Sequence, residues 1–156
     1  MHVYRFHHAW VVRADADAVR RLVDDVAGYG AWWRSVRVLG GDLGSPSLAS
    51  QGSRSGELEV RPPLGYRIRI RLEELPSASA AGAEDELRAS VSGDLEGWCA
   101  WRLAPAPRGT AVFFDQEVVA RALLLRLARP VRPLLQAQHA AVLRHAEAGM
   151  RRALER

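Results

Sequence analysis

Alternating hydrophobic and polar positions run through most of the chain and predict β-strands. The clearest alternation comprises Tyr66, Arg67, Ile68, Arg69, Ile70, Arg71 and Leu72. Side chains alternate between the two faces of a strand, so the apolar set faces inward and the three arginines face outward. The same period predicts further strands at residues 2–13, 36–43, 57–60, 87–91, 95–103 and 110–119.

Three of these strands have a face that we expect to point toward the core. The inward faces comprise Tyr4, Phe6, His8, Trp10 and Val12; Trp101 and Leu103; and Val112, Phe114, Gln116 and Val118. Asp115 and Glu117 then point outward. Gly97 is expected to mark a β-bulge, because glycine inside a strand often does so.

Two short helices are predicted between the first two strands. Asp15 is a suitable N-cap for the first helix, and Gly28 ends it. The apolar stripe of this helix comprises Val19, Leu22, Val23 and Val26. The second helix covers residues 29–36 and carries Trp32 and Trp33. Adjacent helical positions point about 100° apart, so we expect one of these tryptophans to face inward and the other to be exposed or at the mouth of a pocket.

Residues 121–156 predict a short helix followed by a long one at about residues 130–155. One stripe of the long helix comprises Val131, Leu135, Val142, Ala146, Gly149 and Ala153, and the opposite side carries Arg144, Glu147, Arg151 and Glu155. The small residues along the stripe either let the helix pack closely or leave a void beneath it. Residues 44–55 and 76–82 are expected to be loops.

These elements predict one α+β domain over residues 1–156. Consecutive strands favour an antiparallel sheet, and a sheet of seven twisted strands curls. The amphipathic C-terminal helix would then fill the concave side of the sheet.

Composition narrows the function without identifying it. The net charge of +4 comes from 22 arginines against 18 acidic residues, with no lysine and no asparagine, a composition typical of GC-rich genomes such as those of actinobacteria. The arginines are dispersed among the acidic residues, so we expect no nucleic-acid partner. No apolar run is long enough for a transmembrane segment and no signal peptide is evident, which predicts a cytoplasmic protein.

The sequence contains no common catalytic or cofactor motif. It has no P-loop, no GxGxxG, no HExxH and no GxSxG, and we expect no cofactor. His7 and His8 are neighbours on a strand and point to opposite faces, so we expect no metal site. Cys99 is the one cysteine, and its place within a predicted strand favours a buried, inert thiol over a nucleophile.

Three polar residues flank the apolar stripe of the long helix: Gln138, His139 and His145. A polar group that faces the sheet without a partner costs about 1–3 kcal/mol, so each needs a hydrogen bond or a wet cavity. One interpretation of His139 is a structural hydrogen bond to a strand residue such as Gln116. The other is a cavity-lining group that orients a ligand or acts as a general base.

The outward arginines at positions 67, 69 and 71 form a basic ladder. They are expected to form salt bridges with glutamates of neighbouring strands: Glu57, Glu59, Glu86 or Glu96. The alternative is a binding surface for an acidic partner, such as an acyl carrier protein.

Several segments together resemble the START/Bet v 1-like (SRPBCC) superfamily, in particular its bacterial polyketide cyclase/dehydrase-like branch. They are residues 14–19, Tyr29-Gly30-Ala31-Trp32-Trp33, residues 93–98, Gly109-Thr110, Gln138-His139 and Gly149. The resemblance covers essentially the whole chain and implies the helix-grip fold, with a deep apolar cavity between the long helix and the sheet. Gln138 stands where family members commonly have asparagine.

The resemblance and the inward faces together indicate candidate ligand-binding residues. They are His8, Trp10, Trp32, Trp33, Tyr66, Ile68, Ile70, Trp101, Phe114, Gln116, Leu135, Gln138, His139 and Val142. Within this set, the pair Trp32-Trp33 is our candidate for a ligand gate.

Three functions follow as hypotheses. The first is binding of an apolar small molecule, such as a lipid, a polyketide or an isoprenoid. The second is a polyketide aromatase/cyclase, with His139 as the candidate acid or base and Gln116 as an orienting group. The third is an interaction scaffold without a ligand.

Overall fold

The computed structural model describes residues 3–42, 54–75, 85–121 and 132–155. Several predicted features lie outside these ranges. They are the short helix before the long one, the loop at residues 76–82, most of the loop at 44–55, and Val131. The elements from the N-terminus are β1 (Val3–Val12), α1 (Ala16–Asp24), η1 (Val26–Gly28), α2 (Tyr29–Trp32), β2 (Val36–Asp42) and β3 (Ser55–Val60). They continue with β4 (Ile68–Leu75), β5 (Asp85–Gly93), β6 (Leu95–Ala106), β7 (Gly109–Ala120) and α4 (Arg132–Leu154).

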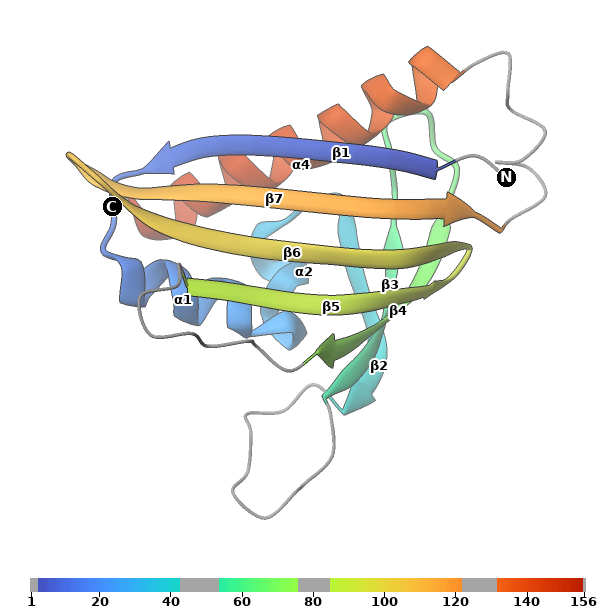
Figure 1. Ribbon diagram of the computed structural model, residues 1–156, viewed down its shortest axis with the longest axis horizontal. Helices are drawn as coiled ribbons and strands as arrows, with labels where there is room; N and C mark the ends of the chain where they lie inside the picture. The colour runs from blue at the N-terminus through green and yellow to red at the C-terminus, as the bar shows by residue number, and fades with distance from the viewer. Residues whose placement is uncertain (1–2, 43–53, 76–84, 122–131, 156) are drawn as a thin grey trace.

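The strands form one seven-stranded sheet in the order β1-β7-β6-β5-β4-β3-β2, in which all six pairings are antiparallel. Strands β1, β7, β6 and β5 lie side by side, whereas β4, β3 and β2 cross the view steeply because the sheet curls (Figure 1). Helix α4 lies along one side of the sheet, and the short helices lie between β1 and β2 in the chain. The predicted α+β helix-grip architecture is therefore confirmed.

The predicted inward faces are confirmed, but the prediction of a β-bulge at Gly97 is wrong. Strand β6 pairs with both of its neighbours without a register shift at Gly97. This residue pairs with Val91 of β5 and with Val118 of β7. A Cβ atom at Gly97 would stand 2.0 Å from the carbonyl oxygen of Glu117, so this glycine allows a close approach of two strands. The register shift in this sheet lies in β2, between Val38 and Gly40.

Helix α1 begins as expected, because Oδ1 of Asp15 accepts a hydrogen bond of 2.8 Å from the backbone N–H of Ala18. It ends at Asp24, earlier than predicted, and the 3₁₀ turn η1 follows it.

Trp32 and Trp33 are both buried, each with 6% exposure, so neither forms the exposed patch that was one of the two expectations for this pair. The predicted helix over residues 29–36 ends at Trp32, and Trp33 has extended backbone angles of φ −105° and ψ 93°. Trp33 therefore leaves the helical phase, and the two indoles stack with their ring centroids 5.7 Å apart. The argument from helical geometry fails because the helix has only four residues.

Helix α4 buries the predicted stripe against the rest of the molecule. Its buried residues are Gln138, Val142, Leu143, Ala146, Gly149 and Met150. On the opposite side, Arg151 and Glu147 form an ion pair of 2.8 Å. None of the described helices is long and apolar enough to cross a membrane.

The arginine ladder lies on the outer face of the sheet and forms the expected salt bridges. Arg67 and Arg69 lie 3.9 and 3.7 Å from the carboxylate of Glu59, and Arg61 donates a hydrogen bond of 2.6 Å to it. These arginines cover Glu59, which is only 1% exposed. The hydrogen bond from Arg61 lowers the pKa of Glu59, and the three positive charges act in the same direction. Part of the basic charge is therefore neutralised within the sheet face.

Candidate functional site

A cavity of about 180 Å³ lies between α4 and the concave face of the sheet, and its walls are mainly apolar. All seven strands and α4 contribute to its lining, together with the segment from α1 to α2. The candidate residues that line it are Trp33, Tyr66, Ile68, Ile70, Trp101, Phe114, Gln116, Leu135, His139 and Val142. They come from distant parts of the chain and meet because the sheet curls around the helix.

Four candidate residues do not line the cavity. His8 faces α4, where burial and the charge of Arg144 lower its pKa. Trp10 packs edge-on against Trp101, with ring centroids 5.9 Å apart. The side-chain oxygen of Gln138 accepts a hydrogen bond of 2.8 Å from the backbone N–H of Leu64.

Trp32 is the fourth candidate residue outside the cavity lining. Its carbonyl group faces Gly149 of α4. The proposed gate formed by Trp32 and Trp33 is therefore a buried pair, and only Trp33 contributes to the cavity wall.

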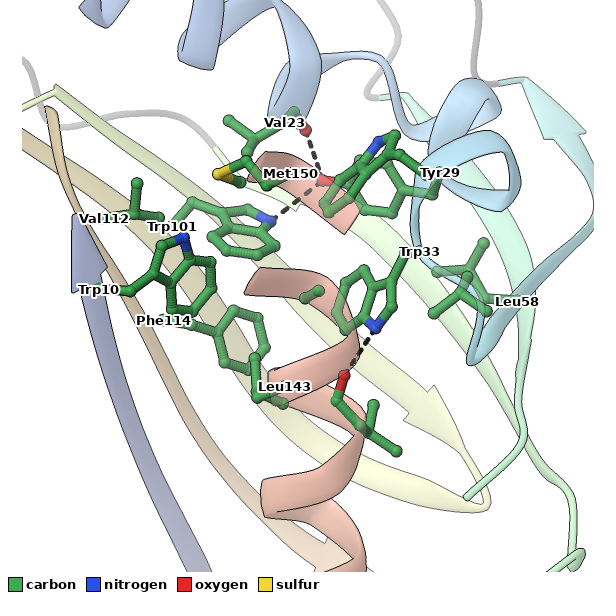
Figure 2. Close-up of a cluster of buried hydrophobic side chains, with 14 of the residues drawn as sticks. Trp10, Val23, Tyr29, Trp33, Leu58, Trp101, Val112, Phe114, Leu143 and Met150 are labelled. Atoms are coloured by element: carbon green, nitrogen blue, oxygen red, sulfur yellow. Dashed lines mark hydrogen bonds between the residues drawn. The ribbon is translucent and has the colours of Figure 1, made fainter. Parts of the chain in front are cut away.

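Hydrogen bonds hold the aromatic side chains at the end of the cavity formed by α2 (Figure 2). The indole N–H of Trp33 donates to the carbonyl oxygen of Val142 at 2.9 Å, and that of Trp101 donates to the hydroxyl of Tyr29 at 3.1 Å. The Tyr29 hydroxyl donates in turn to the carbonyl oxygen of Val23. Burial raises the pKa of Tyr29 far above its ordinary value, so this hydroxyl stays protonated. The aromatic wall is consequently rigid and neutral.

His139 and Gln116 form a polar pair within the apolar lining. Nε2 of His139 lies 2.7 Å from Oε1 of Gln116, joining α4 to β7. The imidazole stacks on Phe6 with ring centroids 3.5 Å apart and planes at 6°. Burial lowers the pKa of His139 to about 3, with a smaller effect from the nearby His8. His139 is therefore neutral at physiological pH.

The structural interpretation of His139 is confirmed, and its action on a ligand stays a prediction. His139 makes the structural hydrogen bond to Gln116, and it also lines the cavity. Its second ring nitrogen, Nδ1, is buried and has no hydrogen-bond partner among the residues that the structure describes. His145, in contrast, is placed by a hydrogen bond between its Nδ1 and the hydroxyl of Ser35.

A charged group that the sequence did not indicate lies in another part of the cavity lining. Arg54 donates hydrogen bonds to Asp24 at 2.7 Å and to both carboxylate oxygens of Glu74 at 2.7 and 2.9 Å. Its pKa is raised, mainly by the hydrogen bond to Glu74. This arginine connects the end of α1 to β4. It lies in a Gly/Ser/Pro-rich stretch without periodicity, so no local signal distinguished it from a loop residue.

Cys99 is half-buried and lines the cavity. Burial raises the pKa of Cys99 to about 12, so the thiol is protonated and a poor nucleophile at neutral pH. No group of three or more His, Cys, Asp or Glu side chains in the described ranges has an arrangement that could hold a metal ion.

No family model matches the chain, and no curated protein matches its sequence. Solved structures resemble it over nearly its whole length. A START superfamily protein from Mycobacterium smegmatis is 14% identical, with a TM-score of 0.68 and 97% of each chain covered.

Two similar structures are described as aromatase/cyclases. The Zhui aromatase/cyclase from Streptomyces sp. R1128 is 19% identical, with a TM-score of 0.63 over 96% of this chain and 90% of that one. The di-domain ARO/CYC StfQ from the steffimycin biosynthetic pathway is 14% identical, with a TM-score of 0.60 over 97% of this chain and 52% of that one. At these identities the likeness shows the fold alone, which this chain shares with these three structures.

Proposed function

We propose that this protein binds an apolar small molecule, such as a lipid, a polyketide or an isoprenoid, in the cavity between α4 and the sheet. The observation that carries the proposal is the apolar cavity of about 180 Å³ at the centre of the fold. Such a cavity leaves apolar side chains without packing partners and costs stability, unless a ligand fills it.

The lining extends along one strand of the sheet. Residues of β4 from Ile68 to Glu74 line the cavity, and six residue steps along a strand span about 20 Å. Charged lining groups include Arg54, Asp24 and Glu74, which are bound to one another. The remaining walls favour the hydrocarbon portion of a ligand.

Native mass spectrometry of the purified protein, followed by solvent extraction, tests this proposal. We expect a bound apolar molecule in the wild type and much less of it in Ala89→Phe, where the new ring would enter the cavity. The control is Ala111→Phe, since position 111 alternates with the inward Val112 and faces outward. Equal ligand content in both variants, each shown to be folded, would contradict the proposal.

A polyketide aromatase/cyclase is the second candidate function, favoured by the polar pair of His139 and Gln116 inside the cavity. A pKa of about 3 makes His139 a weak base, which favours an orienting role over proton transfer. The partner in this case would be an acyl carrier protein that presents the chain. Turnover of a carrier-bound polyketide by the wild type, with a large loss in His139→Ala, would support the enzyme. Unchanged turnover in that variant would remove His139 from catalysis.

A further inference from the structure

The turn between β3 and β4 carries the most exposed large hydrophobic side chain among the described residues. Leu64 is 59% exposed. In this turn the backbone N–H of Gly65 donates to the carbonyl oxygen of Pro62 at 2.9 Å. Pro63 and Gly65, on either side of Leu64, are exposed as well. The tip of the turn therefore presents three consecutive uncharged residues at the surface.

A contact with α4 holds this turn in place and adds a second exposed leucine to the same region. The backbone N–H of Leu64 donates to Oε1 of the buried Gln138, and the connection from β3 to β4 lies beside α4 (Figure 1). Leu134 precedes Gln138 by one helical turn, so both lie on the same side of α4. Its side chain is 44% exposed. Exposed leucines thus come from both the turn and the start of α4.

The two exposed leucines, Leu64 and Leu134, form what we call the leucine patch. The patch adjoins the lining of the cavity. Pro62 and Tyr66, two residues to either side of Leu64, line the cavity, and so does Leu135, the neighbour of Leu134. A surface that binds the leucine patch would consequently lie next to residues of the cavity wall.

Basic side chains flank the turn. Arg61 and Arg67 lie three residues before and after its tip, and Arg69 follows on β4; all three are exposed. Their guanidinium groups share one carboxylate, that of Glu59, which is buried beneath them. The three arginines therefore have an excess of two positive charges over Glu59. Asp94 offsets part of this charge at Arg69, whose backbone N–H donates to its carboxylate at 2.8 Å.

We propose that the leucine patch and its flanking arginines dock on an anionic lipid membrane. The leucines enter the boundary between headgroups and acyl chains, and the arginines attract the negative headgroups. A fluid bilayer accepts an exposed turn without a complementary pocket, whereas leucine is under-represented among the residues that dominate protein–protein binding. Docking depends on this surface alone, and only a role in passing a ligand between membrane and cavity rests on the proposed function.

Cosedimentation of the full chain with lipid vesicles tests this docking. One set of vesicles contains phosphatidylcholine alone, and the other contains equal amounts of phosphatidylcholine and phosphatidylglycerol. We expect the wild type to bind the mixed vesicles at low salt, to bind the neutral vesicles much more weakly, and to dissociate as salt screens the charges. If the folded wild type does not bind the mixed vesicles, the proposal is overturned, and an acidic protein becomes the better partner for this surface.

Matched variants locate the docking surface. Leu64→Ser should weaken binding to the mixed vesicles about 10-fold through lost apolar burial, and Arg67→Gln about 5-fold through the loss of one charge near the headgroups. The controls are Val11→Ser, exposed on β1 beside the last turn of α4, and Arg152→Gln, exposed in that turn. They should change binding little. Equal losses in the variants and their controls would show unspecific attraction of a basic protein and overturn the assignment.

A polarity-sensitive dye reports whether the turn enters the bilayer. Two proteins carry Cys99→Ala together with either Leu64→Cys or Val11→Cys as the labelling site. Emission of the dye at position 64 should shift to the blue with mixed vesicles, whereas emission at position 11 should stay in place. No shift at position 64 in vesicle-bound protein would overturn insertion of the turn. Native mass spectrometry reads the cavity separately, so failure of docking leaves the proposed function intact.

Discussion

Gly149 of α4 lies directly against the carbonyl group of Trp32 in α2. A Cβ atom at position 149 would stand 1.7 Å from this oxygen and 2.8 Å from the carbonyl carbon. The small residue thus lets two helices approach through their main chains, which also brings Trp33 to the cavity wall. Of the two sequence interpretations of the small-residue stripe, close packing holds at this position.

Gly149→Ala should destabilise the protein by about 1–3 kcal/mol, because the added methyl group collides with backbone that cannot move alone. At an open helical position the same change would stabilise by about 1 kcal/mol, so the sign of the effect is diagnostic. Chemical denaturation measures it. The control is Ala148→Val on the exposed side of α4, which should change stability by less than about 1 kcal/mol. A stabilised Gly149→Ala protein would contradict the close contact.

Arg54→Met should weaken the connection between α1 and β4. The change leaves Asp24 and Glu74 without their common partner, and since both carboxylates are about one-third exposed, we expect a loss of about 1–2 kcal/mol. Arg5→Met is the matched control, because the ion pair of Arg5 with Glu117 is more exposed and should contribute less than about 1 kcal/mol. Denaturation at low and high salt measures both, and equal losses would contradict this assignment.

The neutral state of His139 predicts a specific dependence of stability on pH. Its pKa is about 3 in the folded protein and near 6.5 when unfolded, so between these values the unfolded chain binds more protons. The contribution of His139 to stability is therefore fully present above pH 6.5 and is lost as the pH falls toward 3. From pH 8 to pH 5, the wild type should lose about 2 kcal/mol more than His139→Gln.

Denaturation of both proteins across this pH range measures the difference. His8 and His145, whose pKa values are also lowered by burial, remain in the variant, so their contribution cancels. Parallel stability curves would show that His139 is not buried as a neutral group.

Cys99 provides a probe of access to the cavity. With a pKa of about 12, about one thiol in ten thousand is ionised at pH 8, so iodoacetamide should modify the native protein about 10³-fold more slowly than the denatured chain. The control protein carries Cys99→Ala and Ser92→Cys, which moves the thiol to an exposed site on β5. Mass spectrometry follows the reaction. Comparable rates for the native wild type and the control would contradict the raised pKa of Cys99.

Local patterning in the sequence was enough to predict which side chains face inward. Phe114 and Gln116 lie two residues apart on β7 and point the same way, as strand geometry requires. The prediction failed where an element is too short for periodicity to apply, as at Trp32 and Trp33. Arg54 was missed because its function depends on Asp24 and Glu74, which come close only after folding.

The sequence by itself determined the order of the elements, the inward face of each main strand and the polar margin of the C-terminal helix. These features depend on backbone geometry over a few residues, which a single chain segment already contains. Only the tertiary structure decided that Trp33 lines a cavity while Trp10, equally inward, fills the core. Likewise, only the assembled fold pairs one nitrogen of His139 and leaves the other buried without a described partner. A cavity is the space that side chains from many elements leave unfilled. Its presence depends on how all of these side chains pack together, so no local sequence pattern predicts it.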